Sequence, residues 1–194
     1  MGATAAQDRD AVLIERCLAG ERDAFRGLFE RYREPIYRVA CRLVGNKEDA
    51  LDLTQETFTK AFVSLERFRG QASFKTYLTR IAVNACLDFR RRSKPPQVEL
   101  DEDRVGAGGP REAGHAADSD PAQQAQRHEL EHALRRAIDR LPDALRATFL
   151  LHAVEGHTYR EVADTLGVPV GTVMSRIYYA RNHIRQSLGA FLTP

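Results

Sequence analysis

Residues 158–181 have the sequence TYREVADTLGVPVGTVMSRIYYAR. Thr158 and Glu161 form a capping-box pattern, in which two side chains satisfy free backbone N–H groups at the start of a helix. Gly167 can adopt the left-handed backbone that ends a helix, and Pro169 prevents that helix from resuming at once. A second helix is expected directly after the proline. The stretch therefore predicts a helix-turn-helix.

Both helices of this motif are amphipathic. The inward positions are apolar: Val162, Ala163 and Leu166, then Val173, Ile177 and Ala180. The outward positions of the second helix are Thr172, Met174, Ser175, Arg176, Tyr178, Tyr179 and Arg181. Hydrogen-bond donors and flat rings on one helix face suit the major groove, so DNA binding is favoured. Similar helix pairs also occur in proteins that bind no DNA.

Composition indicates a soluble, cytoplasmic protein. The chain has 194 residues, of which 43% are hydrophobic and 29% charged, as in globular proteins. No run of eighteen apolar residues is present, so no membrane insertion is expected, and the acidic N-terminus is unlike a secretory signal. Cys17, Cys41 and Cys86 are widely spaced, and we expect them to be small core residues.

Charge divides the chain into three parts. Residues 1–94 carry 18 Lys and Arg against 13 Asp and Glu, residues 95–126 carry 2 against 7, and residues 127–194 carry 9 against 7. The middle part is rich in Pro and Gly and poor in large apolar residues, which predicts a flexible acidic linker over residues 94–126. Domains are expected at residues 11–93 and 127–192. The net charge of only +2 predicts weak DNA binding by the free chain, and hence a partner that brings it to DNA.

The N-terminal domain is predicted to be a set of amphipathic helices, so the fold class is all-α. A first short helix should bury Val12, Leu13, Cys17 and Leu18, and a second should extend from about Ala24 to Leu43. The expected apolar stripe of the third helix is Leu51, Thr54, Phe58, Ala61, Phe62 and Leu65. A fourth helix is expected over residues 74–92, with Leu78, Ile81, Ala82, Ala85 and Phe89 inward.

Two long runs carry a family resemblance. Residues 49–92, DALDLTQETFTKAFVSLERFRGQASFKTYLTRIAVNACLDFRRR, resemble region 2 of bacterial sigma factors of the sigma-70 family. Residues 141–188, LPDALRATFLLHAVEGHTYREVADTLGVPVGTVMSRIYYARNHIRQSL, resemble region 4. Two such regions joined by a short linker resemble the extracytoplasmic-function (ECF) group. The resemblance implies a chain that binds core RNA polymerase and promoter DNA, directs promoter-specific initiation and is regulated by an anti-sigma factor. It implies no catalysis, cofactor or small-molecule substrate.

The resemblance also implies site residues. Polymerase binding falls on Asp49, Asp52, Gln55 and Glu56. Recognition and melting of the minus-ten element fall on Ser73, Phe74, Lys75, Tyr77, Arg80, Asn84 and Arg91. Minus-thirty-five recognition falls on Tyr159, Arg160, Thr172, Met174, Ser175, Arg176, Tyr179 and Arg181. Tyr77 stands where many relatives have Trp, and Met174 and Tyr179 where they often have basic residues, so a different minus-thirty-five sequence is expected.

Two alternatives remain open from the residues. A stand-alone transcriptional regulator would use only the helix-turn-helix, but it leaves the N-terminal pattern unexplained. A zinc metalloprotease would use His128, Glu129 and His132, which form a literal H-E-x-x-H. On a helix we expect these histidines to face solvent, opposite an apolar side formed by Leu130, Leu134, Ile138 and Leu141. No third ligand is identifiable, so no metal is expected.

Overall fold

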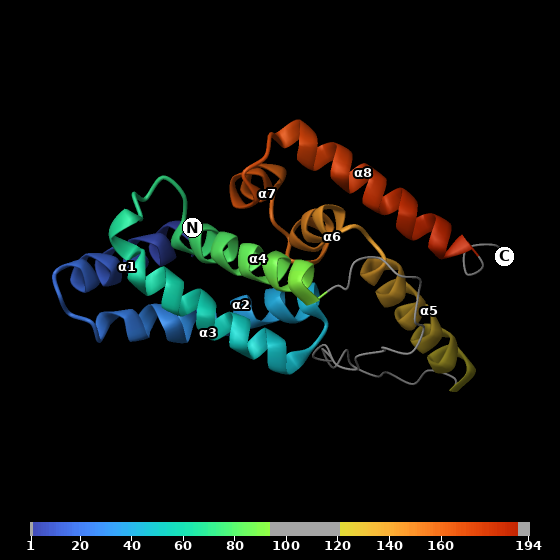
Figure 1. Cartoon of the computed structure of the whole chain (residues 1–194), viewed down its shortest axis with the longest axis horizontal. Helices are drawn as coiled ribbons and strands as arrows, with labels where there is room; N and C mark the ends of the chain where they lie inside the picture. Colours follow the sequence, from blue (N-terminus) through green and yellow to red (C-terminus); the bar gives the residue numbers. More distant parts are fainter. Residues whose placement is uncertain (1, 94–120, 190–194) are drawn as a thin grey trace. The chain divides into compact units, whose positions relative to one another are not determined.

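The computed structural model describes residues 2–93 and 121–189. All regular elements in these two ranges are helical, which confirms the predicted all-α fold class. The chain divides into two compact units. Helices α1 to α4 form the first, and α5, α6, α8 and most of α7 form the second (Figure 1).

The first unit is built around α2. Its elements are α1 (Gly2–Leu18), α2 (Ala24–Val44), α3 (Lys47–Val63), the 3-10 turn η1 (Leu65–Arg67) and α4 (Phe74–Ser93). Helix α2 packs against α1, α3 and α4. The core that they enclose consists of Ile14, Leu28, Tyr32, Ile36, Phe58, Ala61, Leu65, Phe74, Leu78 and Ala82. Burial of these side chains is the main stabilising contribution in this unit.

The junction between α2 and α3 follows from two residues. Gly45 ends α2 with φ of 80°, a left-handed conformation that glycine adopts without strain. The Asn46 side chain then accepts a hydrogen bond from the Glu48 backbone N–H at 2.8 Å, which caps the start of α3. This tight turn sets α3 beside α2.

The buried face of α1 differs from the prediction. Val12 and Leu18 are 55% and 50% exposed, whereas Ile14 and Asp10 are buried. Asp10 can occupy a core position because the Arg31 guanidinium and the Tyr32 hydroxyl both donate hydrogen bonds to its carboxylate. Burial, and then the hydrogen bond to Asp10, raise the pKa of Tyr32. Apolar periodicity could not indicate an inward carboxylate.

The buried face of α3 also differs from the predicted stripe. Leu51 and Phe62 of that stripe are 52% and 40% exposed, whereas Thr57, which was not part of it, is 0% exposed. Thr54 is buried as predicted, at 4%. The hydroxyls of Thr54 and Thr57 donate to the backbone carbonyls four residues earlier, at 2.7 Å in both cases. With their polar groups satisfied inside the helix, threonines can occupy core positions.

The second unit contains the predicted helix-turn-helix. Its elements are α5 (Pro121–Asp139), α6 (Asp143–Phe149), the π-helical turn η2 (Leu150–Val154), α7 (Tyr159–Leu166) and α8 (Val170–Ser187). Helix α8 packs against α5 and α6. Helix α5 begins inside the range expected for the linker, and residues 94–120 of that predicted linker lie outside the described residues.

The predicted apolar face of α5 is wrong in its first half. Leu130 and Leu134 are 41% and 37% exposed, whereas Ala133, Ala137 and Leu141 are buried. The two alanines pack in one cluster with Ala180 of α8. Small residues permit a close approach of the two helix backbones, so Ala133 and Ala137 are buried there in place of Leu130 and Leu134.

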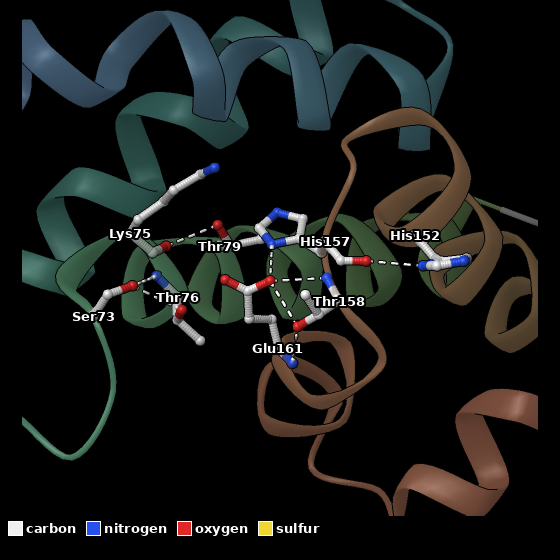
Figure 2. Close-up of polar contacts among 8 residues, drawn as sticks. All are labelled: Ser73, Lys75, Thr76, Thr79, His152, His157, Thr158 and Glu161. Carbon is white, nitrogen blue, oxygen red and sulfur yellow. Dashed lines mark hydrogen bonds and ion pairs between the residues drawn. The ribbon is translucent and has the colours of Figure 1, made fainter. Parts of the chain in front are cut away.

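The capping box at the start of α7 is confirmed. The backbone N–H of Thr158 donates to Glu161 Oε2 at 2.8 Å, and the backbone N–H of Glu161 donates to Thr158 Oγ1 at 3.2 Å (Figure 2).

We expect Thr158→Ala to lower the free energy of unfolding of this unit by about 1 kcal/mol, because a helix-end donor loses its partner. Urea denaturation followed by circular dichroism measures the change. Ser187→Ala removes an exposed hydroxyl near the end of α8 and is the control. An equal change in both variants would contradict the cap assignment.

Candidate nucleic-acid interface

The exposed face of α3 combines acidic, amide and apolar side chains. Asp52 and Gln55 are exposed, and Asp49 is half-buried. Glu56 lies on the same face and forms an ion pair with Lys60 at 2.5 Å. Leu51 on this helix is 52% exposed. The sequence-predicted polymerase-binding residues are therefore brought together on one accessible helix face, beside apolar surface that suits a protein partner.

Two of the predicted minus-ten residues, at the start of α4, have structural roles. The Ser73 hydroxyl accepts a hydrogen bond from the Thr76 backbone N–H at 3.1 Å and lies 2.8 Å from Thr76 Oγ1, so it caps α4 (Figure 2). Phe74 is only 2% exposed and its ring packs edge-on against Tyr32 and Phe68. The ring of Phe74 is part of the core, and its contact with DNA stays a prediction.

Tyr77 is anchored at its phenol. Its hydroxyl lies 2.6 Å from Ser64 Oγ and 3.2 Å from the Ser64 carbonyl oxygen, and its ring centroid lies 5.0 Å from that of Phe68. The side chain is half-buried, so its orientation is fixed by the residues after α3. The contribution of Ser64 could not be predicted, because it lies 13 residues away in the sequence.

The outward face of α4 carries Arg80, Asn84 and Arg91, all exposed. Their spacings of four and seven residues place them on one side of the helix. Lys75 is also exposed, but it lies nine residues before Asn84, which corresponds to the opposite side of α4. The structure thus groups three of the predicted minus-ten residues and separates Lys75 from them.

The arginine run at the end of α4 has divided roles. Arg90 Nη1 donates to the Leu43 carbonyl oxygen at 3.0 Å, where a cation stabilises the C-terminal end of α2. The Arg91 side chain is 70% exposed and lies 3.4 Å from Asp88. Surface pairs of this kind are weak, so Arg91 can still meet a phosphate.

The helix-turn-helix has the predicted construction. Gly167 has φ of 64°, and α8 begins directly after Pro169. Val162, Val173 and Ile177 are buried, as expected for inward positions. The inward positions of both helices are therefore buried, and the other side of α8 is accessible.

The accessible side of α8 contains most of the predicted minus-thirty-five residues. Met174, Tyr178 and Tyr179 are 54%, 63% and 56% exposed, and Ser175 is exposed with its hydroxyl donating to backbone carbonyls of the preceding turn. Arg181 is exposed, whereas Thr172 and Arg176 are half-buried. Tyr178, which was predicted to face outward but is not among the residues that the resemblance implies, is the most exposed of these large side chains.

Tyr159 and Arg160 lie at the start of α7. Tyr159 is 37% exposed, and its ring centroid is 4.5 Å from that of His152. His152 Nδ1 donates to the His157 carbonyl oxygen at 2.8 Å (Figure 2). The π-helical turn that carries His152 thus closes the loop before α7 and supports Tyr159. No sequence pattern indicated this role of His152.

The H-E-x-x-H segment lies on α5, with His128, Glu129 and His132 exposed. Within residues 2–93 and 121–189, no three His, Cys, Asp or Glu side chains are grouped so that they could hold a metal ion. In the same ranges, no helix has the length and apolarity needed to cross a bilayer.

Two of the cysteines are core residues, as predicted. Cys41 and Cys86 are 3% and 0% exposed, and Cys17 is half-buried. Burial is the main cause that raises the pKa of the Cys86 thiol to about 12. A protonated, buried thiol is a poor nucleophile, so Cys86 serves packing.

Family models match both units of the chain. The model for sigma-70 region 2 matches residues 28–95, and the model for sigma-70 region 4 matches residues 131–184. The RNA polymerase sigma-H factor of Pseudomonas aeruginosa is 35% identical over 190 residues, which cover 96% of this chain and 97% of that protein. The ECF RNA polymerase sigma-E factor of Haemophilus influenzae is 34% identical over 95% of this chain and 97% of its own length.

Two solved structures share the fold. CnrH, in complex with the cytosolic domain of CnrY, has a TM-score of 0.67 at 24% identity, over 94% of this chain and 99% of CnrH. The sigma factor RpoE of Bartonella quintana, in complex with the anti-sigma factor NepR, has a TM-score of 0.62 at 23% identity, over 85% of this chain and 96% of RpoE.

Proposed function

The chain belongs to the ECF group of the sigma-70 family of RNA polymerase sigma factors, and from that premise we propose how its helices share the steps of initiation. It is a sigma factor that binds core RNA polymerase and directs promoter-specific transcription. Residues 11–93 bind polymerase and melt the minus-ten element, and residues 127–192 recognise the minus-thirty-five element. Melting is driven by binding, with no covalent step.

Polymerase docks on the exposed face of α3. Asp52, Gln55 and Glu56 present carboxylates and an amide on one accessible side, and the exposed Leu51 adds apolar contact area. Carboxylates at the rim of such a surface favour a basic partner and set the orientation of binding. This face is proposed to hold the chain on the enzyme throughout promoter recognition.

Minus-ten recognition uses the outward face of α4. Arg80 and Arg91 are placed to neutralise phosphates, and Asn84 between them can pair with the edge of an unstacked base. Tyr77, fixed by its bond to Ser64, provides a rigid ring at the start of this face. The observation that carries the proposal is this exposed, aligned set within the matched sigma-70 region 2.

The minus-thirty-five element is bound by α8, with α7 as the supporting helix. Arg176 and Tyr179 supply donors toward the groove and the Ser175 hydroxyl oxygen can accept, while Tyr159, Arg160 and Arg181 suit the backbone. With a net charge of only +2, the free chain gains little from counterion release. Polymerase is therefore needed for tight promoter binding.

An anti-sigma factor is a further proposed partner. The structure of similar fold from Bartonella quintana contains a sigma factor with the anti-sigma factor NepR. The exposed apolar side chains of α3, among them Leu51 and Val63, give a protein inhibitor a surface that overlaps the polymerase-binding face. Such a factor would inhibit by competing with polymerase.

The role of Asn84 separates base capture from duplex binding. We expect Asn84→Ala to leave closed-complex formation nearly unchanged and to reduce open-complex formation about tenfold, since a lost hydrogen bond to a captured base is worth about 1–2 kcal/mol. Electrophoretic retention measures the closed complex, and permanganate footprinting of holoenzyme on promoter DNA measures melting.

Ser93→Ala is the matched control, because Ser93 is an exposed polar residue of α4 that lies nine residues after Asn84, on the opposite side of the helix. Equal melting by the Asn84 variant and the parent would remove Asn84 from the site. A loss of melting in both variants would point to a general effect on α4.

A further inference from the structure

The exposed surface of α8 is divided lengthwise into two chemically different flanks. Val170, Met174 and Tyr178 are 41%, 54% and 63% exposed. They follow one another at four-residue steps, so each is displaced by only about 40° around the helix from the one before. Thr172, Arg176 and Tyr179 lie on the other flank, and Tyr179 is 56% exposed. Ser175 lies between the two flanks and, unlike the apolar trio, is small.

This apolar flank, formed by Val170, Met174 and Tyr178, lies outside the buried side of α8. The inward side of α8 is occupied by Val173, Ile177, Ala180 and Ile184, which are 0–8% exposed. Exposed large apolar side chains in a row at a DNA-binding helix need a partner to cover them. The flank is continuous with the groove-facing surface, and the exposed Arg181 and Arg185 follow Met174 and Tyr178 at spacings of seven. Cations beside the flank suit a polyanion and disfavour a basic protein.

The major groove offers one apolar group, the 5-methyl of thymine. We infer that the apolar flank of α8 recognises thymine methyl groups in the minus-thirty-five element, with Met174 and Tyr178 as the specificity-determining residues and Val170 at the edge of the contact. A thioether is flexible and polarisable, and a phenol ring adds flat apolar area, so both can cover a methyl group. Arg176 on the opposite flank supplies the polar contacts. The inference rests on the proposed minus-thirty-five role of α8.

Replacement of thymine by uracil tests this directly, because it removes only the methyl group and leaves pairing intact. A promoter is first obtained by selecting transcribed sequences from a randomised minus-thirty-five library with holoenzyme. Each thymine of the selected element is then replaced by deoxyuridine, and run-off transcription is measured at subsaturating holoenzyme. We expect a loss of about fourfold at one or two positions, as for one buried methyl-sized group. Replacing a neighbouring cytosine by 5-methylcytosine supplies a gain-of-methyl control.

In holoenzymes with Met174→Ala or Tyr178→Ala, replacing thymine by uracil should no longer reduce transcription at one position of the minus-thirty-five element. The positions affected in the two variants should be adjacent or nearly so. Leu134→Ala is the control, because it truncates a partly exposed apolar side chain on α5 and should keep the full penalty. Circular dichroism verifies that each variant is folded.

Two outcomes overturn the inference: equal transcription from thymine and uracil templates at every position, or a Met174→Ala,Tyr178→Ala double variant that retains the full uracil penalty. No effect of uracil at any position, combined with a strong loss on scrambling the whole minus-thirty-five element, would refute the methyl contact and leave the proposed function intact. No loss on scrambling would instead refute the proposed role of α8.

Discussion

Replacing both Asp52 and Glu56 with arginine is expected to abolish holoenzyme assembly. The two carboxylates lie four residues apart on the accessible face of α3, and the double replacement changes the charge of that face by four units. If a basic surface of polymerase docks there, attraction becomes repulsion at close range, which costs several kcal/mol in complexes of this kind. Pull-down with core polymerase at moderate salt measures the effect as a loss of retention of at least a hundredfold.

Glu15→Arg with Glu34→Arg is the matched control. It makes the same charge change at two exposed positions on α1 and α2 and should leave retention nearly unchanged. Unaltered helicity of both double variants shows that the fold persists. Normal retention of the α3 variant would refute the docking assignment, and equal loss in both variants would reduce the effect to overall charge.

Arg176→Ala is the second change with a large expected effect. A guanidinium that makes two parallel hydrogen bonds to a guanine edge contributes about 1–3 kcal/mol of discrimination. We expect that loss in promoter binding by holoenzyme, together with a relaxed preference at one position of the minus-thirty-five element. Transcription of a randomised minus-thirty-five library by parent and variant holoenzymes measures both.

Two further variants separate a base contact from a phosphate contact. Arg176→Lys keeps the charge but not the planar fork, so it should restore a phosphate contact better than a base contact. Arg185→Ala removes an exposed arginine farther along α8 and should weaken binding uniformly across sequences. Identical preferences and yields from Arg176→Ala and the parent would mean that this face of α8 does not meet DNA.

Local patterns in the sequence were sufficient to predict the helices and the turn of the helix-turn-helix. The capping box of Thr158 and Glu161, the left-handed Gly167 and the helix start after Pro169 all involve residues within a few positions of one another. Their chemistry acts locally, so spacing alone predicts it. The same holds for Asp52, Gln55 and Glu56 of α3 and for Arg80, Asn84 and Arg91 of α4, because helical periodicity places each set on one side of its helix.

Only the tertiary structure determined which polar residues are buried and which apolar residues are exposed. Asp10 is buried because Arg31 and Tyr32, more than twenty residues away, donate to it. Phe74 lies in the core because its ring packs against those of Tyr32 and Phe68. Tyr77 is fixed by Ser64 across 13 residues. The apolar flank of α8 remains exposed because α5 and α6 cover only the other side of that helix. Each outcome depends on partners distant in sequence, which residue type and periodicity do not encode.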